Sequence, residues 1–158
     1  MMKQAIYSAL LMAGLAMMQP VWSAPKFNHA GIQKGAISES CYHEPCSIGK
    51  VLVFKQLNKT RDSSMIELTL LGGERMWKSK KITWNKRTHK VYITCSLSNP
   101  TLTIGGQVTT LPLSPRWTAP GVLYSATQLY MQACHNMKGA DESEVAKRFG
   151  YNVEDNYY

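Results

Sequence analysis

Four cysteines constrain the fold of this 158-residue chain more than any other residues, because they fall as one close pair and one distant pair. Cys41 and Cys46 stand five positions apart, whereas Cys95 and Cys134 can meet only through the fold. Four cysteines allow three pairings, and we expect Cys41–Cys46 with Cys95–Cys134 because the first pair is already close. Loop-closure entropy predicts that the short bridge stabilises the fold by about 2 kcal/mol and the long one by about 4 kcal/mol. The long bridge should therefore brace the fold, and the short bridge should shape a loop.

The N-terminal segment predicts export. Lys3 gives it a positive start, residues 5–18 are apolar and uncharged, and a short polar stretch follows. This order is typical of a secretory signal peptide, here residues 1–23, with cleavage near Ser23 or Ala24. An uncleaved membrane anchor is the alternative, although the apolar run is shorter than the roughly 20 residues that span a bilayer. We expect a periplasmic or secreted protein in which the cysteines are oxidised, with no transmembrane segment in the mature chain.

Short-range alternation of apolar and polar residues predicts an antiparallel sheet. Gly72-Gly73 is expected to end one strand, residues 85–88 to form a turn, and Gly105-Gly106 to form a hairpin turn. Residues 24–40 are interpreted as an extended, partly mobile lead-in to a single domain, residues 24–158. The expected strands are residues 50–57, 65–71 and 76–84, a segment that places Val91, Ile93 and Cys95 on one face, and residues 101–104 and 107–111.

Towards the C-terminus the apolar period changes to that of a helix. Ser125 is the expected N-cap of an amphipathic helix that carries Cys134 on its buried face, which favours the Cys95–Cys134 bridge. Asp141 is placed to cap a second, short helix, and Gly150 to end it. The predicted fold is therefore α+β: an antiparallel sheet of about five or six strands with one or two C-terminal helices, disulfide-stapled.

The first candidate binding site is the loop between Cys41 and Cys46. A disulfide there would hold Tyr42, His43, Glu44 and Pro45 on a rigid protrusion at the start of an apolar strand. Such a loop suits insertion into a cleft of another protein, because the bridge removes conformational freedom before binding. A turn that only fixes the start of the strand, with His43 facing solvent, is the structural alternative.

This loop is similar to the Cys-x-x-x-x-Cys loop, with an adjacent histidine and acid, of the Ivy-type periplasmic inhibitors of vertebrate lysozyme. In that family the loop also leads into an apolar strand, and its histidine enters the active site of the target. The resemblance covers residues 41–55 and implies an inhibitory role for His43. It departs in one respect, since Pro45 follows His43-Glu44 here, whereas the proline precedes the pair there. Animal lysozymes are basic, so the charge of this chain argues for an acidic partner instead.

Charge defines the second candidate. The net charge is +8, or about +7 without Lys3, and residues 75–140 contain no aspartate or glutamate. Cations interleaved with tryptophans indicate an anionic partner, whereas an edge strand protected by lysines, with its tryptophans buried, is the alternative. Nucleic acid is not expected as a partner in the periplasm. The residues of this basic hairpin are Arg75, Trp77, Lys78, Lys80, Lys81, Trp84, Lys86, Arg87 and Lys90.

Catalytic and metal-binding patterns are weak in this sequence. It has four histidines but no Gly-x-Ser-x-Gly or His-Glu-x-x-His motif, and no paired Cys-x-x-Cys that would favour zinc over disulfides. His135 is expected on a solvated helix face beside Gln128 and Gln132, and His89 at the rim of a strand. We expect neither a metal nor another cofactor, and no enzymatic activity. A hydrolase that uses His43 and Glu44 is the remaining enzymatic alternative.

Together these features predict a small, exported, bacterial-type binding protein. Within that class we favour an inhibitor or immunity-like protein that blocks an acidic partner through the Cys41–Cys46 loop. The alternative is an envelope protein that binds anionic polymers or lipids through the basic hairpin, residues 75–90.

Overall fold

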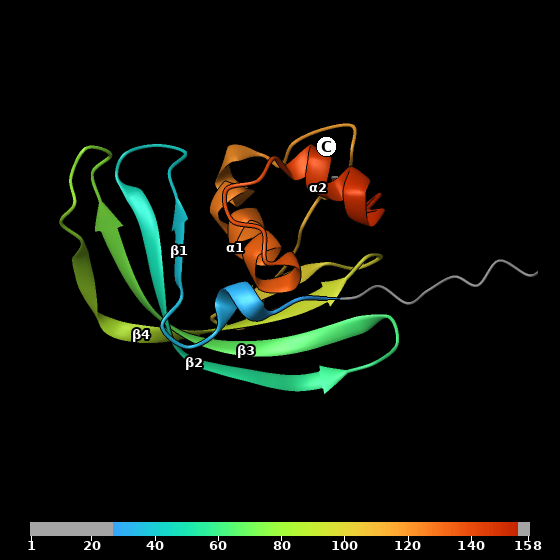
Figure 1. Ribbon diagram of the computed structural model, residues 1–158, viewed down its shortest axis with the longest axis horizontal. Coiled ribbons are helices and arrows are strands. Elements are labelled where there is room, and N and C mark those ends of the chain that lie inside the picture. The colour runs from blue at the N-terminus through green and yellow to red at the C-terminus, as the bar shows by residue number, and fades with distance from the viewer. Residues whose placement is uncertain (1–26, 155–158) are drawn as a thin grey trace, which may run out of the picture.

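One antiparallel sheet organises the molecule, and each strand in it pairs with its neighbours in sequence, in the order β1-β2-β3-β4-β5-β6 (Figure 1). The computed structural model describes residues 27–154, so the expected signal peptide and its cleavage site lie outside the described residues. The six-stranded antiparallel sheet and the two C-terminal α-helices confirm the predicted α+β fold. The elements are η1 (Ala30–Ile32), β1 (Ile37–Ser40), β2 (Cys46–Lys59), β3 (Ser63–Arg75), β4 (Thr83–Ser96), β5 (Thr101–Ile104), β6 (Gln107–Thr110), η2 (Gly121–Leu123), α1 (Tyr124–His135) and α2 (Glu142–Phe149).

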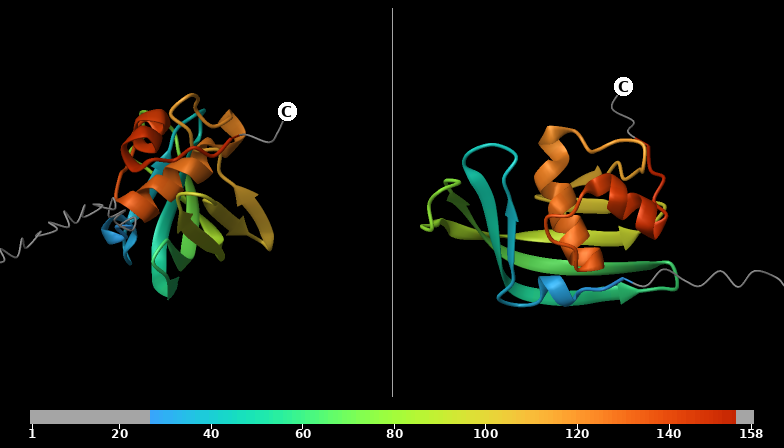
Figure 2. Two further views of the ribbon diagram at one scale, coloured as in Figure 1. Left: turned by 90° about the vertical axis from the view of Figure 1, so that its right-hand side faces the viewer. Right: turned by 45° about the horizontal axis from the view of Figure 1, so that its top comes forward.

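The sheet is strongly bent, and both α-helices lie on its concave side (Figures 1 and 2). Three register shifts interrupt the pairing, two between β2 and β3 and one between β3 and β4. Such bulges bend a strand and increase its local twist. As a result, the ends of these strands nearest Cys46, Arg75 and Thr83 rise away from the part of the sheet that lies under α1 (Figure 1).

The core lies between the concave face of the sheet and the helices. On β3, Ile66, Leu68 and Leu70 alternate with more polar residues and are at most 4% exposed. Side chains of this kind each stabilise a fold by roughly 1.5–3 kcal/mol when fully buried. The disulfide between Cys95 of β4 and Cys134 of α1 crosses this core, with both cysteines fully buried. The predicted long bridge is therefore confirmed, and it joins the sheet to α1.

Two predicted chain reversals are wrong. β3 continues through Gly72-Gly73, and residues 85–88 lie within β4, so the loop of this hairpin is residues 76–82, where we expected a strand. The glycines allow a close approach instead of a turn. A Cβ on Gly73 would lie 2.8 Å from the ring of Trp84 on the paired strand. Glycine and asparagine are therefore misleading as turn signals in this part of the chain.

The helices begin and end largely as expected. The side chain of Asp141 accepts hydrogen bonds from the backbone N–H groups of Ser143 and Glu144, and Gly150 ends α2 with a φ of 82°. The expected N-cap of α1 is wrong, because Leu123 precedes the helix and Ser125 lies inside its first turn. The hydroxyl of Ser125 instead donates to Ser40 of β1 at 2.9 Å.

The lead-in is more structured than expected over residues 27–40. It contains η1 and the edge strand β1, and the side chain of Ile32 is fully buried in the core. The backbone N–H of Asn28 donates to the carbonyl of Cys134 at 2.8 Å. This segment is therefore an integral part of the fold.

Candidate binding site

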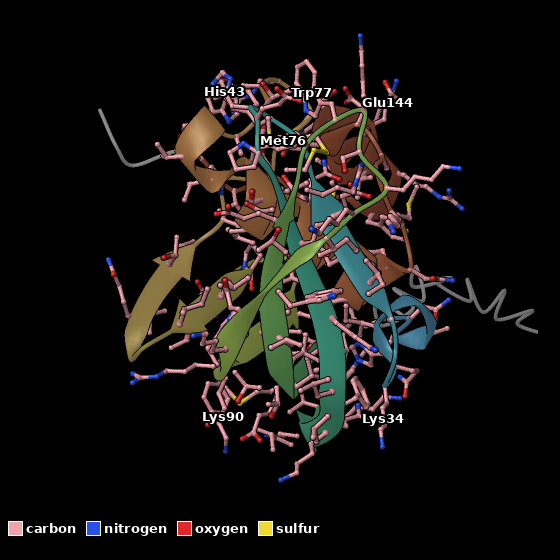
Figure 3. All side chains as sticks on the ribbon, turned by 90° about the vertical axis from the view of Figure 1, so that its left-hand side faces the viewer. Lys34, His43, Met76, Trp77, Lys90 and Glu144 are labelled. Atoms are coloured by element: carbon pink, nitrogen blue, oxygen red, sulfur yellow. A yellow bond between two sulfur atoms is a disulfide. The ribbon has the colours of Figure 1, made fainter. Side chains whose placement is uncertain are left out.

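Two loops lie side by side at one end of the molecule. β2 pairs with β3 in a register that places Cys46 opposite Arg75, so the loop before β2 and the loop after β3 begin at neighbouring positions. His43 of the first loop and Met76 and Trp77 of the second lie at the same end, whereas Lys34 and Lys90 lie at the opposite end (Figure 3). We call residues 41–46 and 75–82 together the two-loop tip.

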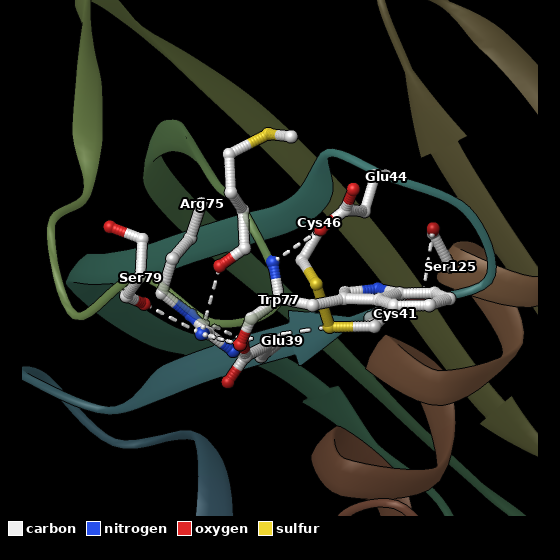
Figure 4. Close-up of a disulfide and its surroundings, with 10 residues drawn as sticks. Glu39, Cys41, Glu44, Cys46, Arg75, Trp77, Ser79 and Ser125 are labelled. Carbon is white, nitrogen blue, oxygen red and sulfur yellow. Dashed lines mark hydrogen bonds and ion pairs between the residues drawn. A yellow bond between two sulfur atoms is a disulfide. The ribbon is translucent and has the colours of Figure 1, made fainter.

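The disulfide predicted within the first loop is present. Cys41 and Cys46 are bonded, and their Cα atoms lie 4.3 Å apart (Figure 4). Within the described residues, Glu39, Cys41 and Cys46 form a group of potential metal ligands. The bridge occupies both sulfur atoms and Glu39 pairs with Arg75, and metal binding needs free thiolates. The group is therefore not a thiolate metal site while the bridge is intact.

Arg75 fixes the conformation of the second loop. Its guanidinium forms an ion pair with Glu39 on β1, and Nε donates to the same carboxylate oxygen at 2.9 Å. Nη1 donates to the carbonyls of Met76, Trp77 and Ser79 at 3.2, 3.0 and 2.8 Å (Figure 4). A planar cation with five donors suits this task. We expected Arg75 to be part of the basic patch that binds a partner. Its guanidinium instead makes intramolecular contacts with Glu39 and with the backbone of the second loop.

The two loops are also joined directly. The backbone N–H of Trp77 donates to Oε1 of Glu44 at 2.8 Å (Figure 4). Among the described residues no hydrogen bond joins Glu44 to His43, whose ring instead contacts Tyr42 with 4.4 Å between ring centroids. The acid–histidine pairing that a hydrolase would use is thus absent from this arrangement.

Three large apolar side chains are exposed on the two-loop tip. Tyr42 is 52% exposed, Met76 51% and Trp77 56%. Tyr42 is nevertheless packed against the protein on one side. Its ring centroid lies 5.5 Å from that of Tyr124, and the ring lies so close to Gly121 that a Cβ on this glycine would be only 2.6 Å from the ring of Tyr42. Exposed aromatic side chains on a rigid frame are typical of the residues that dominate binding energy at interfaces.

The cations of the basic hairpin divide into two groups. Lys78, Lys80 and Lys81 are exposed on the two-loop tip, whereas Lys86, Arg87 and Lys90 are exposed along the first half of β4. That half pairs only with β3, because β5 pairs with β4 from Val91 onward. Lys90 lies at the far end of the molecule, 3.4 Å from Glu67. The hairpin is thus not one continuous patch.

Both tryptophans of this hairpin are exposed. Trp77 is 56% exposed, and Trp84 on β4 is 37% exposed. The expected burial of both rings in the core is therefore wrong, although the first half of β4 is an edge that carries exposed cations, as that alternative assumed. Only the part of the hairpin in the two-loop tip lies beside His43.

The predicted position of His135 is wrong. It is buried, as are Gln128 and Gln132. Later segments cover His135 and Gln128, whereas the side chain of Gln132 donates to the carbonyls of Gly31 and Ile37 in the N-terminal segment. Nε2 of His135 lies 2.6 Å from the hydroxyl of Tyr151, and the ring of Phe149 stacks on it at 3.8 Å. Burial lowers the pKa of His135 to about 4. A helical period indicates which residues share a face, but not whether a later helix covers that face.

One serine–histidine pair was not recognisable from sequence. Nε2 of His29 lies 2.8 Å from the hydroxyl of Ser64, and Nδ1 donates to the carbonyl of Ala133 at 2.7 Å. This geometry resembles a nucleophile and its base. Ser64 is only 1% exposed, however, so its hydroxyl is shielded from solvent. The pair is therefore structural and ties the N-terminal segment to β3 and α1.

The fold and this site define a disulfide-bonded α+β protein that presents two joined loops at one end. Comparisons with protein-family models, curated proteins and solved structures find no match to this chain. Within residues 27–154, no helix has the length and apolar character needed to cross a membrane.

Proposed function

We propose that this protein is a small exported binding protein that blocks an acidic partner protein through the two-loop tip. One observation carries the proposal: Tyr42, Met76 and Trp77 are exposed on loops that a disulfide, Arg75 and Glu44 hold in place. A rigid loop loses little conformational freedom on binding, so more of its contact energy becomes affinity. Two disulfides fit folding in an oxidising compartment such as the periplasm or the extracellular space.

Charge supports an acidic partner. Lys78, Lys80 and Lys81 are exposed on the same loop as Met76 and Trp77, and the chain carries a net charge of +8. Complementary charge at the rim of an interface steers association and excludes wrong partners. The arrangement fits an inhibitor or immunity-like protein in which the apolar residues enter a cleft with an acidic rim.

Binding to anionic lipids or envelope polymers is the second candidate. The observation that favours it is the exposure of Met76 and Trp77 next to three lysines on the same loop. Apolar side chains flanked by cations also characterise segments that lie at the surface of anionic membranes. This candidate needs the cations of the tip, but it does not need the shape of the disulfide loop.

A binding experiment with matched variants tests the proposal. The wild-type chain, Tyr42→Ala/Trp77→Ala and the control Trp117→Ala are immobilised, and partners are captured from envelope extracts and then purified. Trp117 is also exposed, at 41%, but it lies outside the two-loop tip. We expect the control to bind as the wild type does and the double variant to bind at least about 30-fold more weakly, as for an interface hot spot.

Other outcomes decide between the candidates. Equal affinity of the double variant and the wild type would overturn the role of the two-loop tip. If no protein partner is captured, and anionic vesicles bind with an affinity that falls steeply with salt, the second candidate replaces the first. The variant Lys80→Glu/Lys81→Glu should then abolish vesicle binding, whereas His43→Ala should have no effect.

A further inference from the structure

A cavity of about 440 Å³ lies on the concave side of the sheet. Its walls come from β1, β2, β3, β4 and β5 on one side, and from η2 and the first two turns of α1 on the other. The sheet is bent, and α1 covers only part of its concave face (Figures 1 and 2). The volume of the cavity falls within the range of small-molecule sites.

The floor of the cavity is apolar. Leu70, Leu102 and Leu129 line it and are at most 8% exposed. At its mouth Ile104 is 45% exposed and Val122 is 91% exposed. Apolar surface left in water is unfavourable, and a ligand with an apolar body would remove it from water. These residues therefore favour a ligand that contains a hydrocarbon chain.

Several polar side chains that line the cavity have no hydrogen-bond or ion-pair partner within residues 27–154. They offer a carboxylate, which only accepts hydrogen bonds, and an amide, an imidazole and hydroxyls, which both donate and accept. A ligand hydroxyl also donates and accepts, so a head group with several hydroxyls can satisfy this mixture. The side chains are those of Ser38, Ser47, Glu74, Asn85 and His89.

Two of these polar groups are brought together by a glycine. A Cβ on Gly72 would lie 2.7 Å from Nδ2 of Asn85 and 3.7 Å from Cε1 of His89. The missing side chain at Gly72 therefore leaves room for the amide and the imidazole on the same side of the cavity. Together they can hydrogen-bond to neighbouring groups of one ligand.

Charge around the cavity disfavours a head group of either sign. Glu74 is the one charged side chain among the lining residues, and it opposes an anion. A cation is opposed by the net charge of +8 and by Lys86 and Arg87, which are exposed on β4 between Asn85 and His89 in the sequence. An uncharged head group meets neither repulsion.

We propose that this cavity binds a single-chain amphiphile with an uncharged, hydroxylated head group, such as an alkyl glycoside or a monoacylglycerol. The alkyl chain would lie against Leu70, Leu102 and Leu129, with the head group near Asn85 and His89. None of the lining residues belongs to the two-loop tip, so the inference does not depend on the proposed function.

Titration of the full chain with octyl compounds, followed by calorimetry below the concentrations at which they form micelles, tests the head group. The uncharged probes are octyl glucoside and monooctanoylglycerol, and the comparisons are octanoate, octylammonium and glucose. We expect at least one uncharged octyl probe to bind, and the tighter of the two identifies the preferred head. It should bind at least about fivefold more tightly than either charged octyl compound, because its head makes several hydrogen bonds in the cavity. Glucose, which lacks the chain, should show no binding.

A first variant locates the binding site by filling it. Ala126→Phe places a ring into the cavity from α1, and its control Val108→Phe places the same ring on β6, where Val108 is 63% exposed and outside the cavity. We expect Ala126→Phe to abolish binding of the uncharged probe and the control to bind as the wild type does. Circular dichroism shows whether each variant is folded.

A second variant does not disturb the core. Asn85→Ala removes an exposed amide that has no side-chain partner within residues 27–154, and Asn58→Ala is its control, since Asn58 is exposed on β2 outside the cavity. We expect Asn85→Ala to weaken binding of the uncharged probe about 2- to 10-fold, the range for one hydrogen bond, and the control to leave it unchanged.

A third variant tests the charge argument. Glu74→Gln removes the lining charge, and its control Glu144→Gln removes an exposed carboxylate outside the cavity. We expect Glu74→Gln to strengthen octanoate binding up to about fivefold and the control to leave it unchanged.

Three results would overturn the proposal. The first is wild-type affinity for the uncharged probe in Asn85→Ala and in folded Ala126→Phe, because the ligand would then bind elsewhere. The second is the absence of binding by either uncharged octyl probe up to about 1 mM. The third is equal or tighter binding of octanoate or octylammonium, which would remove the argument for an uncharged head.

Discussion

The backbone N–H of Trp77 donates to the carboxylate of Glu44 at 2.8 Å, across 33 residues of sequence. A second contact, between Arg75 and Glu39, joins the same two hairpins closer to the sheet. The two loops are therefore one surface whose shape depends on both hairpins. A partner that binds the tip would meet this shape already formed, which reduces the entropy lost on association.

The first prediction concerns this contact. Glu44→Ala removes the acceptor, so the Trp77 N–H should exchange with solvent about 2- to 10-fold faster, the range expected for one hydrogen bond of about 0.5–1.5 kcal/mol. Amide hydrogen exchange followed by NMR measures this. Glu154→Ala is the control, since it also removes an exposed carboxylate that accepts a hydrogen bond, here from Arg116. Unchanged exchange at Trp77 in Glu44→Ala would show that the contact does not fix the loop.

The second prediction separates the two disulfides. Cys95→Ala/Cys134→Ala opens a loop with a sequence separation of 39, and Cys41→Ala/Cys46→Ala opens one with a separation of 5. We expect losses in the free energy of unfolding of about 4 and about 2 kcal/mol respectively. Urea denaturation of the oxidised chains measures both. Equal losses would contradict the assignment of the long bridge as the main brace.

The third prediction concerns acid stability. Burial lowers the pKa of His135 to about 4, and the positive charges of His29 and Arg148 act in the same direction. The unfolded chain, with an ordinary histidine pKa of about 6.5, then binds the proton more tightly than the folded chain does. Stability is therefore fully present above about pH 6.5 and decreases as the pH falls to about 4, by an amount on the order of 3 kcal/mol.

Unfolding in urea at a series of pH values tests this prediction. His135→Gln should lower stability at pH 7 but should remove most of its decrease between pH 6.5 and 4. His43→Gln is the control, because His43 is exposed on the two-loop tip. We expect His43→Gln to keep the pH dependence of the wild type. If His135→Gln keeps it as well, a group other than His135 is responsible for the loss of stability in acid.

Sequence patterns predicted the sheet well where the alternation was regular. The hairpin around Gly105-Gly106 and the buried face shared by Val91, Ile93 and Cys95 are present as expected. The errors fall at Gly72-Gly73 and at residues 85–88, where turn-type residues lie within long strands. There Gly73 provides space for the ring of Trp84, and Gly72 provides space for the side chain of Asn85. Sequence spacing alone does not distinguish close packing of two strands from a turn.

The candidate site was predictable only in part. The disulfide of the first loop followed from the spacing of Cys41 and Cys46. Its contact with Trp77 depends on the register of β2 and β3 that places Cys46 opposite Arg75, far from the short loop that joins these strands. Two register shifts between them help to set this pairing, and neither has a clear sequence signal. The cavity depends on the bend of the sheet, which arises from bulges whose sequence signals are weak.

The last prediction concerns the support of Tyr42. A Cβ on Gly121 would lie 2.6 Å from the ring of Tyr42, closer than carbon atoms approach without a shift. In Gly121→Ala we therefore expect the ring of Tyr42 to shift from its present position, 5.5 Å from the ring centroid of Tyr124. Because Tyr42 is half exposed, we expect the free energy of unfolding to change by less than about 1 kcal/mol.

The displacement can be measured without a partner, as the loss of nuclear Overhauser contacts between the rings of Tyr42 and Tyr124. Val122→Ala is the control, since Val122 is the next residue and its side chain is 91% exposed. Contacts that persist in Gly121→Ala would mean that the backbone of η2 yields instead of the ring. If the ring moves and Gly121→Ala also binds the partner more weakly, binding depends on where the ring of Tyr42 lies and not only on there being a tyrosine at this position. This is the result expected for a preformed surface.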